Sequence, residues 1–489
     1  MKLRSNEFFP LAEQGIKDAS LQKNLAVFRD FVPDARAKAI TRMENYPHRR
    51  QTLKQVKNAA LANLAAYLEQ FEQHCTRAGG QVHWASNAEQ LNGIVIDICR
   101  SVQARTIVKG KSMVSEECAL LAALVDAGFD TVETDLGEYI IQLADEPPSH
   151  ITGPAIHKTF EQVVDLFQEH HQLGQRELDT TKKVMAEART ILRDKFVHAD
   201  VGITGANYLI ADTGTVGLVT NEGNGDLSSS LPKVHIVITS IEKVVPNYAS
   251  AMAIQRALVP NATAQAITCY TSFFTGKGSA ENGGGPEQFH VILLDNGRSK
   301  ILQSDYRDIL RCIRCSACLN HCPIYTRTGG HAYGWVYPGP MGSVWTPLIN
   351  QYNGKGLDQT HYLPNACTTC GRCEEVCPVD IPLPKLLRNL RAEEQQQGLQ
   401  PIRWVWGMKL FMALLTKPVL FRWLSNLTVG LLYRWGKKRG AFSSLLLANG
   451  WTQVRDLPAP EGDTFFKQLR KKQRRDKQLH DKNFQDQMS

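Results

Sequence analysis

The chain lacks an apolar run long enough to cross a bilayer. In the Trp- and Leu-rich region that starts at about residue 402, the longest runs without a charged residue, 423–433 and 440–454, have 11 and 15 residues, whereas a membrane-spanning helix needs about 20. The N-terminal stretch MKLRSNEFFPLAEQ also lacks the apolar segment that follows the basic start of a secretory signal. We therefore expect a chain that stays in the cytoplasm.

Isolated cysteines are few, and no dinucleotide motif is present. None of the strand-like segments is followed by the G-x-G-x-x-G pattern that binds a dinucleotide. Of twelve cysteines, only four are scattered singly, as reduced core thiols are: Cys75, Cys99, Cys118 and Cys269. The composition, 43% hydrophobic and 21% charged, is that of a globular protein. The length of 489 residues suggests about three domains.

The other eight cysteines form two identical ladders with the spacing C-x2-C-x2-C-x3-C-P. Three thiolates at this spacing surround one corner of an iron–sulfur cube, and the fourth points to a neighbouring cube. The ladders therefore predict two [4Fe-4S] clusters that exchange their fourth ligands. One cluster would be held by Cys312, Cys315, Cys318 and Cys377, and the other by Cys367, Cys370, Cys373 and Cys322.

Pro323 and Pro378 close the two ladders and turn the chain away after the last sulfur. Zinc is the alternative metal, because C-x2-C pairs also build sites of four thiolates, and a disulfide framework is disfavoured in the cytoplasm. Three arginines stand beside the ligands: Arg311, Arg314 and Arg372. Positive charge at these positions would favour the reduced form of the clusters. Ordinary surface arginines are the simpler interpretation.

Periodicity divides the chain into four segments. Residues 1–80 predict a helical extension, and residues 81–300 predict an α/β domain with a largely parallel sheet, because strand-like runs such as TIVKG alternate with helices. One of these helices is expected over SEECALLAALVDAG. Residues 301–398 hold the ladders, and the Gly- and Pro-rich stretch between them predicts a structured loop. Residues 399–489 predict a Trp-rich helical region.

Candidates for a small-anion site lie in the α/β domain. Lys109 and Lys111 follow a strand and precede a helix, a position where anions bind in α/β folds. Glu222 is the carboxylate in the turn of a glycine-rich stretch. Exposed lysines and plain hairpin turns are the simpler interpretations. The segment GKGSAENGGGP, residues 276–286, predicts a flexible turn or lid.

The C-terminal region is basic. The segment RWVWGMKLFMALLTKPVLFRWL either lies in a membrane interface or packs against the ladder-bearing residues 301–398 or a partner. The tail over 467–482 has eight basic residues and two acidic ones. A solvated, disordered end is its simplest interpretation, and its few aromatic residues disfavour binding of nucleic acid.

Several segments, taken in order, resemble the lactate utilisation protein B family over nearly the whole chain. They are KGKSMVSEE, ETDLGEYIIQL, GITGANYLIADTGTVGLVTNEGN and the two ladders. The resemblance implies a LUD domain similar to the sugar-phosphate isomerase and CoA-transferase type, followed by an α-helical ferredoxin module. It also implies a three-protein system that oxidises L-lactate to pyruvate, with a cysteine-rich iron–sulfur subunit and a second LUD-domain protein as partners.

We therefore expect an electron-transfer subunit of an L-lactate oxidising complex. The chain lacks both a flavin or nicotinamide motif and the cysteine-cysteine-glycine motif of the family's partners, which suggests that the carbon chemistry begins elsewhere. The alternative is a stand-alone enzyme that acts on a small carboxylate or a CoA-type substrate in the α/β domain.

Overall fold

The computed structural model describes residues 3–278, 284–445, 452 and 455–488. It contains two compact units, residues 1–399 and 400–489, called here the N-terminal unit and the C-terminal unit. Finer boundaries at residues 80 and 300 stay a prediction. The middle of the predicted GKGSAENGGGP turn, residues 279–283, lies outside the described residues.

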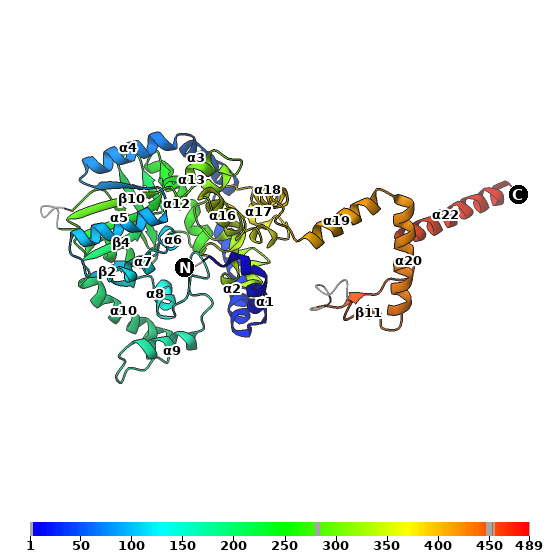
Figure 1. The fold of residues 1–489 in the computed structure, drawn as a ribbon, viewed down its shortest axis with the longest axis horizontal. Helices are drawn as coiled ribbons and strands as arrows, with labels where there is room; N and C mark the ends of the chain where they lie inside the picture. Colours follow the sequence, from blue (N-terminus) through cyan, green and yellow to red (C-terminus); the bar gives the residue numbers. More distant parts are fainter. Residues whose placement is uncertain (1–2, 279–283, 446–451, 453–454, 489) are drawn as a thin grey trace. The chain divides into compact units, whose positions relative to one another are not determined.

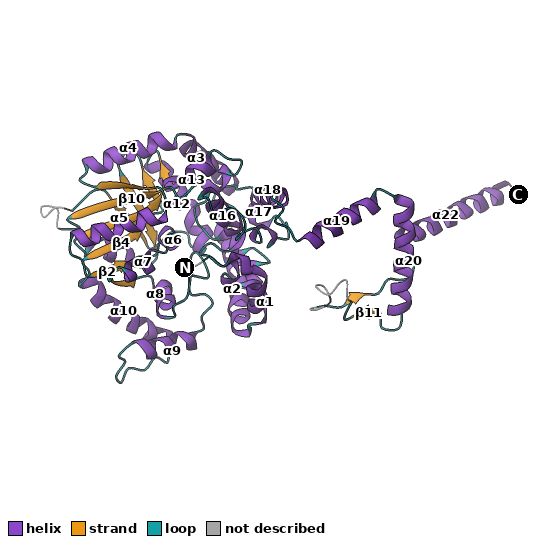
Figure 2. Cartoon of the chain, viewed as in Figure 1, coloured by secondary structure: helices purple, strands orange, loops and turns teal. Residues whose placement is uncertain are grey.

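The N-terminal unit is built on a six-stranded sheet in which all neighbouring strands are parallel (Figure 2). In sheet order the strands are β1 (Gln81–Ala85), β10 (Gln288–Leu294), β7 (Val234–Ser240), β4 (Val201–Gly205), β2 (Thr106–Lys109) and β3 (Asp130–Glu133). The predicted α/β fold with a parallel sheet is therefore confirmed.

Helices cover both faces of this sheet, and β10 shows why its strands are continuously apolar. Val291 and Leu293 pack with α4 (Leu64–Arg77) on one face. Ile292 and Leu294 pack with α5 (Ala88–Ser101) on the other. Successive side chains of a strand point to opposite faces, so a strand covered on both sides is apolar at most positions.

Further helices and a second sheet complete the α/β part. The helices are α6 (Met113–Glu117), α7 (Leu120–Asp126), α8 (Leu136–Leu143), α9 (Phe160–His170), α10 (Thr181–Val197), α11 (Asn224–Ser230), α12 (Tyr248–Thr263) and α13 (Arg298–Leu302). The second sheet has the order β8 (Val244–Val245), β5 (Tyr208–Ile210), β6 (Thr215–Thr220) and β9 (Tyr270–Phe274). The single helix expected over SEECALLAALVDAG is wrong: α6 and α7 are separated at Ala119, whose φ of 52° does not continue a right-handed helix.

The N-terminal helices α1 (Phe8–Lys17), α2 (Ala19–Thr41) and α3 (Tyr46–Ala62) pack on the cysteine-bearing segment (Figure 1). Arg36 in α2 donates to the carbonyl oxygen of Val376 at 2.8 Å, and Arg50 in α3 donates to that of Cys377 at 2.7 Å. These helices thus fix the backbone of the second ladder across more than 300 residues of sequence.

The cysteine-bearing segment consists of short helices: η4 (Arg307–Arg311), α14 (Ala317–Asn320), α15 (Tyr325–Thr328), η5 (His331–Tyr333), α16 (Gly339–Tyr352), η6 (Leu363–Asn365), α17 (Arg372–Glu375) and α18 (Leu383–Gln396). The structured loop predicted between the ladders is wrong, because its second half forms the start of α16. Pro340 stands in the first turn, where its missing N–H costs nothing. Trp345 in α16 is completely buried, so packing outweighs the weak helix propensity of this stretch.

The C-terminal unit contains α19 (Ile402–Leu415), α20 (Pro418–Gly436), the pair β11 (Ala441–Phe442) and β12 (Leu457–Pro458), and α22 (Phe465–Met488). The basic tail is part of α22, in place of the disordered end that its composition suggested. Among the described residues no single helix passes the length and hydropathy test for a membrane span; α19 and α20 pass it only together, with a bend of 110° between them.

Candidate iron–sulfur site and adjoining cavity

The eight ladder cysteines lie at corresponding places in two similar turns. Cys312 follows η4, and Cys367 follows shortly after η6. The third cysteine of each ladder lies in a one-turn helix, Cys318 in α14 and Cys373 in α17. All eight are free thiols.

The two ladders repeat the same backbone geometry. In both ladders the residue two positions after the first cysteine has a positive φ, 59° at Arg314 and 56° at Thr369. The residue four positions after the first cysteine also has a positive φ, 62° at Ser316 and 82° at Gly371. Such turns point successive N–H groups inward, and the N–H of Thr369 donates to the Cys367 Sγ at 3.3 Å. Backbone donors around thiolates are characteristic of iron–sulfur sites.

The thiols fall into two electrostatic groups. Burial, with Cys377 and Cys312 nearby, raises the pKa of the Cys315 thiol to about 12. Burial, with Cys367 and Cys370 nearby, raises the pKa of the Cys322 thiol to about 11. The fourth cysteine of each ladder is thus a close neighbour of cysteines in the other ladder. We call Cys312, Cys315, Cys318 and Cys377 the first set, and Cys367, Cys370, Cys373 and Cys322 the second set.

The donor sets fit the predicted clusters. Buried thiols with raised pKa values keep their protons unless a metal centre compensates the negative charge of the thiolates. Each set offers four sulfurs, and the N–H of Ile381 donates to the Cys377 Sγ at 3.4 Å. The ligand assignment stays a prediction, and this grouping supports it.

The three arginines beside the ligands differ in their surroundings. Arg314 is buried, and its guanidinium lies 4.0 Å from the ring centroid of Trp345. Arg311 is also buried and donates to the backbone oxygen of Asp380. The side chain of Arg372 is 54% exposed and pairs with a neighbouring glutamate. Only the first two arginines therefore act through a low dielectric.

A buried ion network joins the α/β part to the first set. Arg298 in α13 pairs with Glu117 in α6 at 2.8 Å and with Glu242 at 2.9 Å. Glu242 also faces Arg314, with an N–O distance of 3.6 Å. The hydroxyl of Tyr337 donates to Glu117 at 2.8 Å. Charged groups this deeply buried are tolerated only when they are paired, so the network fixes how the two parts meet.

The two lysines predicted for an anion site have different roles. Lys109 is completely buried, and its ammonium forms ion pairs with Glu133 at 2.6 Å and Glu116 at 2.9 Å. Lys111 lines a cavity of about 260 Å³, together with Glu222. The structure therefore brings Lys111 and Glu222 to one cavity, and Lys109 is not among the described residues that line it.

The cavity lies beyond the carboxyl ends of β2, β4 and β7, where ligands bind in open α/β sheets. Two wall residues that the sequence did not predict for this site are Lys243, after β7, and Arg314 of the first ladder. The sequence did contain a signal for Lys243, because Glu242 and Lys243 interrupt the otherwise apolar run VHIVITSIEKVV. Nothing in the sequence indicated that a ladder residue would reach this cavity.

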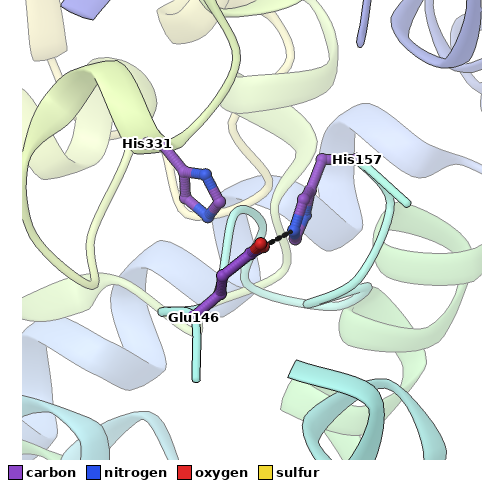
Figure 3. Close-up of side chains that lie close together, drawn as sticks. All are labelled: Glu146, His157 and His331. Atoms are coloured by element: carbon purple, nitrogen blue, oxygen red, sulfur yellow. Dashed lines mark hydrogen bonds and ion pairs between the residues drawn. The ribbon is translucent and has the colours of Figure 1, made fainter. Parts of the chain in front are cut away.

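A carboxylate and two histidines form a second polar cluster (Figure 3). Figure 3 shows Glu146 hydrogen-bonded to His157, with His331 beside them. Lys158 pairs with the same carboxylate, and the Nε2 of His331 bonds to the Pro147 carbonyl oxygen at 2.8 Å. Because these groups already satisfy one another, the cluster acts as a polar cross-link between the α8–α9 connection and η5.

Comparison with known proteins agrees with this structure. The LUD domain model matches residues 68–294, and the 4Fe-4S dicluster domain model matches residues 308–381. Lactate utilization protein B of Bacillus licheniformis is 37% identical over 467 residues, with 95% of this chain and 96% of the relative covered. Lactate utilization protein B of Bacillus subtilis is also 37% identical over 467 residues, with the same coverage of the two chains.

The uncharacterized electron transport protein YkgF of Escherichia coli is 36% identical over 485 residues, with 97% of this chain and 98% of the relative covered. The predicted resemblance, the LUD fold and the presence of two 4Fe-4S clusters are thereby confirmed. The chain belongs to the lactate utilization protein B family.

Proposed function

We propose that the chain is the iron–sulfur electron-transfer subunit of a cytoplasmic complex that oxidises L-lactate to pyruvate. The observation that supports this most directly is that the fourth cysteine of each ladder lies close to cysteines of the other ladder. When bound, the two clusters supply one-electron transfer with little rearrangement of their ligands. The family membership supplies the metabolic context.

The two sets differ in how they meet the surroundings. Among the ladder cysteines only Cys370, in the second set, is exposed. The first set is adjacent to the cavity through Arg314. We infer that electrons enter at the first set and leave from the second set to a downstream acceptor.

Partners follow from the same reasoning. Two-electron oxidation of a hydroxy acid ordinarily calls for an organic cofactor, and the sequence shows no motif for one. We therefore propose a complex with a cysteine-rich iron–sulfur subunit and a second LUD-domain protein. Reduction of the clusters by L-lactate in the reconstituted complex, monitored by electron paramagnetic resonance (EPR), tests this function. Failure of lactate to reduce them would count against it.

The ligand exchange has its own test. Cys377→Ser should alter the same EPR signal as Cys312→Ser, and Cys322→Ser the same signal as Cys367→Ser, in anaerobically prepared protein. If Cys377→Ser instead matches Cys367→Ser, each ladder binds its own cluster. Zinc, or far fewer than eight irons per chain, would contradict the cluster assignment altogether.

The stand-alone enzyme remains a second candidate because the cavity offers a ligand site inside this chain. The purified chain, assayed with L-lactate and an artificial electron acceptor, separates the two candidates. Turnover without partners would favour the stand-alone enzyme.

We further propose that the C-terminal unit contacts an anionic membrane surface. Helix α19 has no buried residue, and Trp404 and Trp406 are 61% and 65% exposed. Residues 400–440 contain eight Lys and Arg but no Asp or Glu. Exposed aromatic and basic residues in one helix are typical of interfacial binding.

Flotation of the full chain with vesicles tests this contact. We expect binding to phosphatidylglycerol vesicles, little binding to phosphatidylcholine vesicles, and weaker binding after the double substitution of Arg403→Glu and Lys409→Glu. The same reversal at Lys471 and Lys472 in α22 is the control. Absence of the wild-type chain from the floated lipid fraction would remove the membrane contact.

A further inference from the structure

The cavity of the N-terminal unit has the size and position of a small-molecule site. Its volume of about 260 Å³ is just below the usual range for ligand pockets, which favours a small acid over a nucleotide. The close approach of Gly205 to Ser112 shapes it, because a Cβ at Gly205 would lie 3.1 Å from the Ser112 side chain. The ends of β2 and β4 therefore meet at this wall.

Three cationic side chains from the described part of the chain line the cavity, and two of them are already paired or hydrogen-bonded. Arg314 is paired with Glu242, and Lys243 donates to the carbonyl oxygen of Ala206. Among the residues that the structure describes, Lys111 is the lysine of this wall without a hydrogen bond or ion pair. Its three N–H donors are thus available to an anion.

Two carboxylates share the wall with Lys111. Asp135 caps α8 by accepting from the N–H groups of Gly137 and Glu138. Glu222 accepts a hydrogen bond from the N–H of Leu136. A carboxylate has about four acceptor sites, so Glu222 retains capacity for a hydroxyl donor. The wall therefore combines a free cation with a free acceptor.

Several other residues that line the cavity are apolar, and one of them belongs to a ladder. Leu218, Leu258 and Ile313 contribute the hydrophobic surface. Ile313 and Arg314 are the two residues between Cys312 and Cys315. An occupant of the cavity thus contacts the loop that carries two ligands of the first set.

We propose that this cavity binds a small 2-hydroxy monocarboxylate, with its carboxylate on Lys111 and its hydroxyl donating to Glu222, and that binding is coupled to the first set through Ile313 and Arg314. This inference rests on the proposed electron-transfer function and adds that the hydroxy acid is bound by this chain. A carboxylate alone would be repelled by Glu222, so the hydroxyl provides the selectivity.

Titration calorimetry on the anaerobic, cluster-loaded full chain tests the site. L-Lactate should bind about tenfold more tightly than propionate, which lacks the hydroxyl. Lys111→Gln should weaken binding of L-lactate by about tenfold or more. Lys233→Gln is the matched control, because Lys233 is exposed and lies at the amino end of β7, whereas the cavity lies at the carboxyl ends of the strands. Glu222→Gln should reduce the preference for L-lactate over propionate.

The coupling has a separate readout in the redox titration of the two clusters. A bound anion disfavours further negative charge nearby, so saturating L-lactate should lower the potential of the first-set cluster. Each tenfold difference in affinity between its two redox states corresponds to about 59 mV. The second-set cluster should move less, and Lys111→Gln should raise the lactate concentration at which the displacement is half complete by about tenfold or more.

The results distinguish this inference from the proposed function. Equal binding of L-lactate and propionate, unchanged binding by Lys111→Gln, or no binding at all would overturn the cavity site. If partner subunits still reduce the clusters in that case, the electron-transfer function stands and the hydroxy acid binds elsewhere. Clusters that no partner reduces would overturn the electron-transfer function, whatever the calorimetry shows.

Discussion

Replacement of Arg314 by glutamine should lower the reduction potential of the first-set cluster and leave the second-set cluster nearly unchanged. The side chain of Arg314 is only 9% exposed, and Glu242 retains its ion pair with Arg298 at 2.9 Å after the substitution. The variant therefore removes one buried positive charge without leaving a carboxylate unpaired. A long polar side chain also preserves most of the packing on Trp345.

The magnitude follows from Coulomb's law. A positive charge roughly 8 Å from the added electron, at an effective dielectric constant of about 20, stabilises the reduced state by about 2 kcal/mol. For a one-electron couple this corresponds to about 90 mV. The potential should fall by this amount because the reduced cluster loses more stabilisation than the oxidised one.

An EPR-monitored redox titration under anaerobic conditions measures both potentials. Arg372→Gln is the matched control: the Arg372 side chain is 54% exposed and paired with Glu375, so solvent screens it and its loss should shift either potential by less than about 20 mV. A fall of similar size in both clusters, or none in the Arg314 variant, would refute the assignment of Arg314 to the first set.

Three further predictions concern stability and are measured by denaturant unfolding of the anaerobic chain. Arg298→Met should cost about 3–5 kcal/mol, because it leaves the buried Glu117 without its cation and leaves Glu242 with only the more distant Arg314; a cost below about 1 kcal/mol would contradict the network. Gly202→Ala should lower the free energy of unfolding by at least about 1–3 kcal/mol, because the new Cβ would lie 1.7 Å from a carbonyl oxygen of α11. Gly93→Ala in α5 is the control: its Cβ would meet nothing within 4 Å, so this substitution should be neutral or stabilising. Burial lowers the pKa of His235 to about 3, so the unfolded chain binds the extra proton and stability falls as pH drops below about 6.5. Between pH 7 and 5 this loss should be about 2 kcal/mol, and His235→Asn should remove that part of the pH dependence; an unchanged slope would exclude the effect.

Much of the fold was predictable because its signals are local. Runs such as TIVKG and FHVILLD are strands whose two faces are both covered, and their apolar composition records that burial. The ladder spacing predicted two cubane clusters because ligand geometry is encoded within twelve residues.

Long-range pairing was not predictable from such signals. Lys109 lies opposite Glu133 only because β2 and β3 pair in that register, and this pairing takes its ammonium away from the cavity. Helix α16 depends on burial of Trp345 by segments distant in sequence, so its Gly- and Pro-rich composition indicated a loop. The contribution of Arg314 to the cavity wall likewise depends on how the ladder packs against the α/β part.

The anchoring of the second ladder by α2 and α3 has a consequence for biosynthesis. Arg36 and Arg50 donate to carbonyl groups that are 340 and 327 residues further along the chain. At about 5–20 residues per second, the ribosome needs roughly 20–60 s to synthesise that distance. During this interval Arg36 and Arg50 lack these carbonyl partners, so the second ladder reaches its anchored form, and iron–sulfur delivery can be completed, only late in translation or after release.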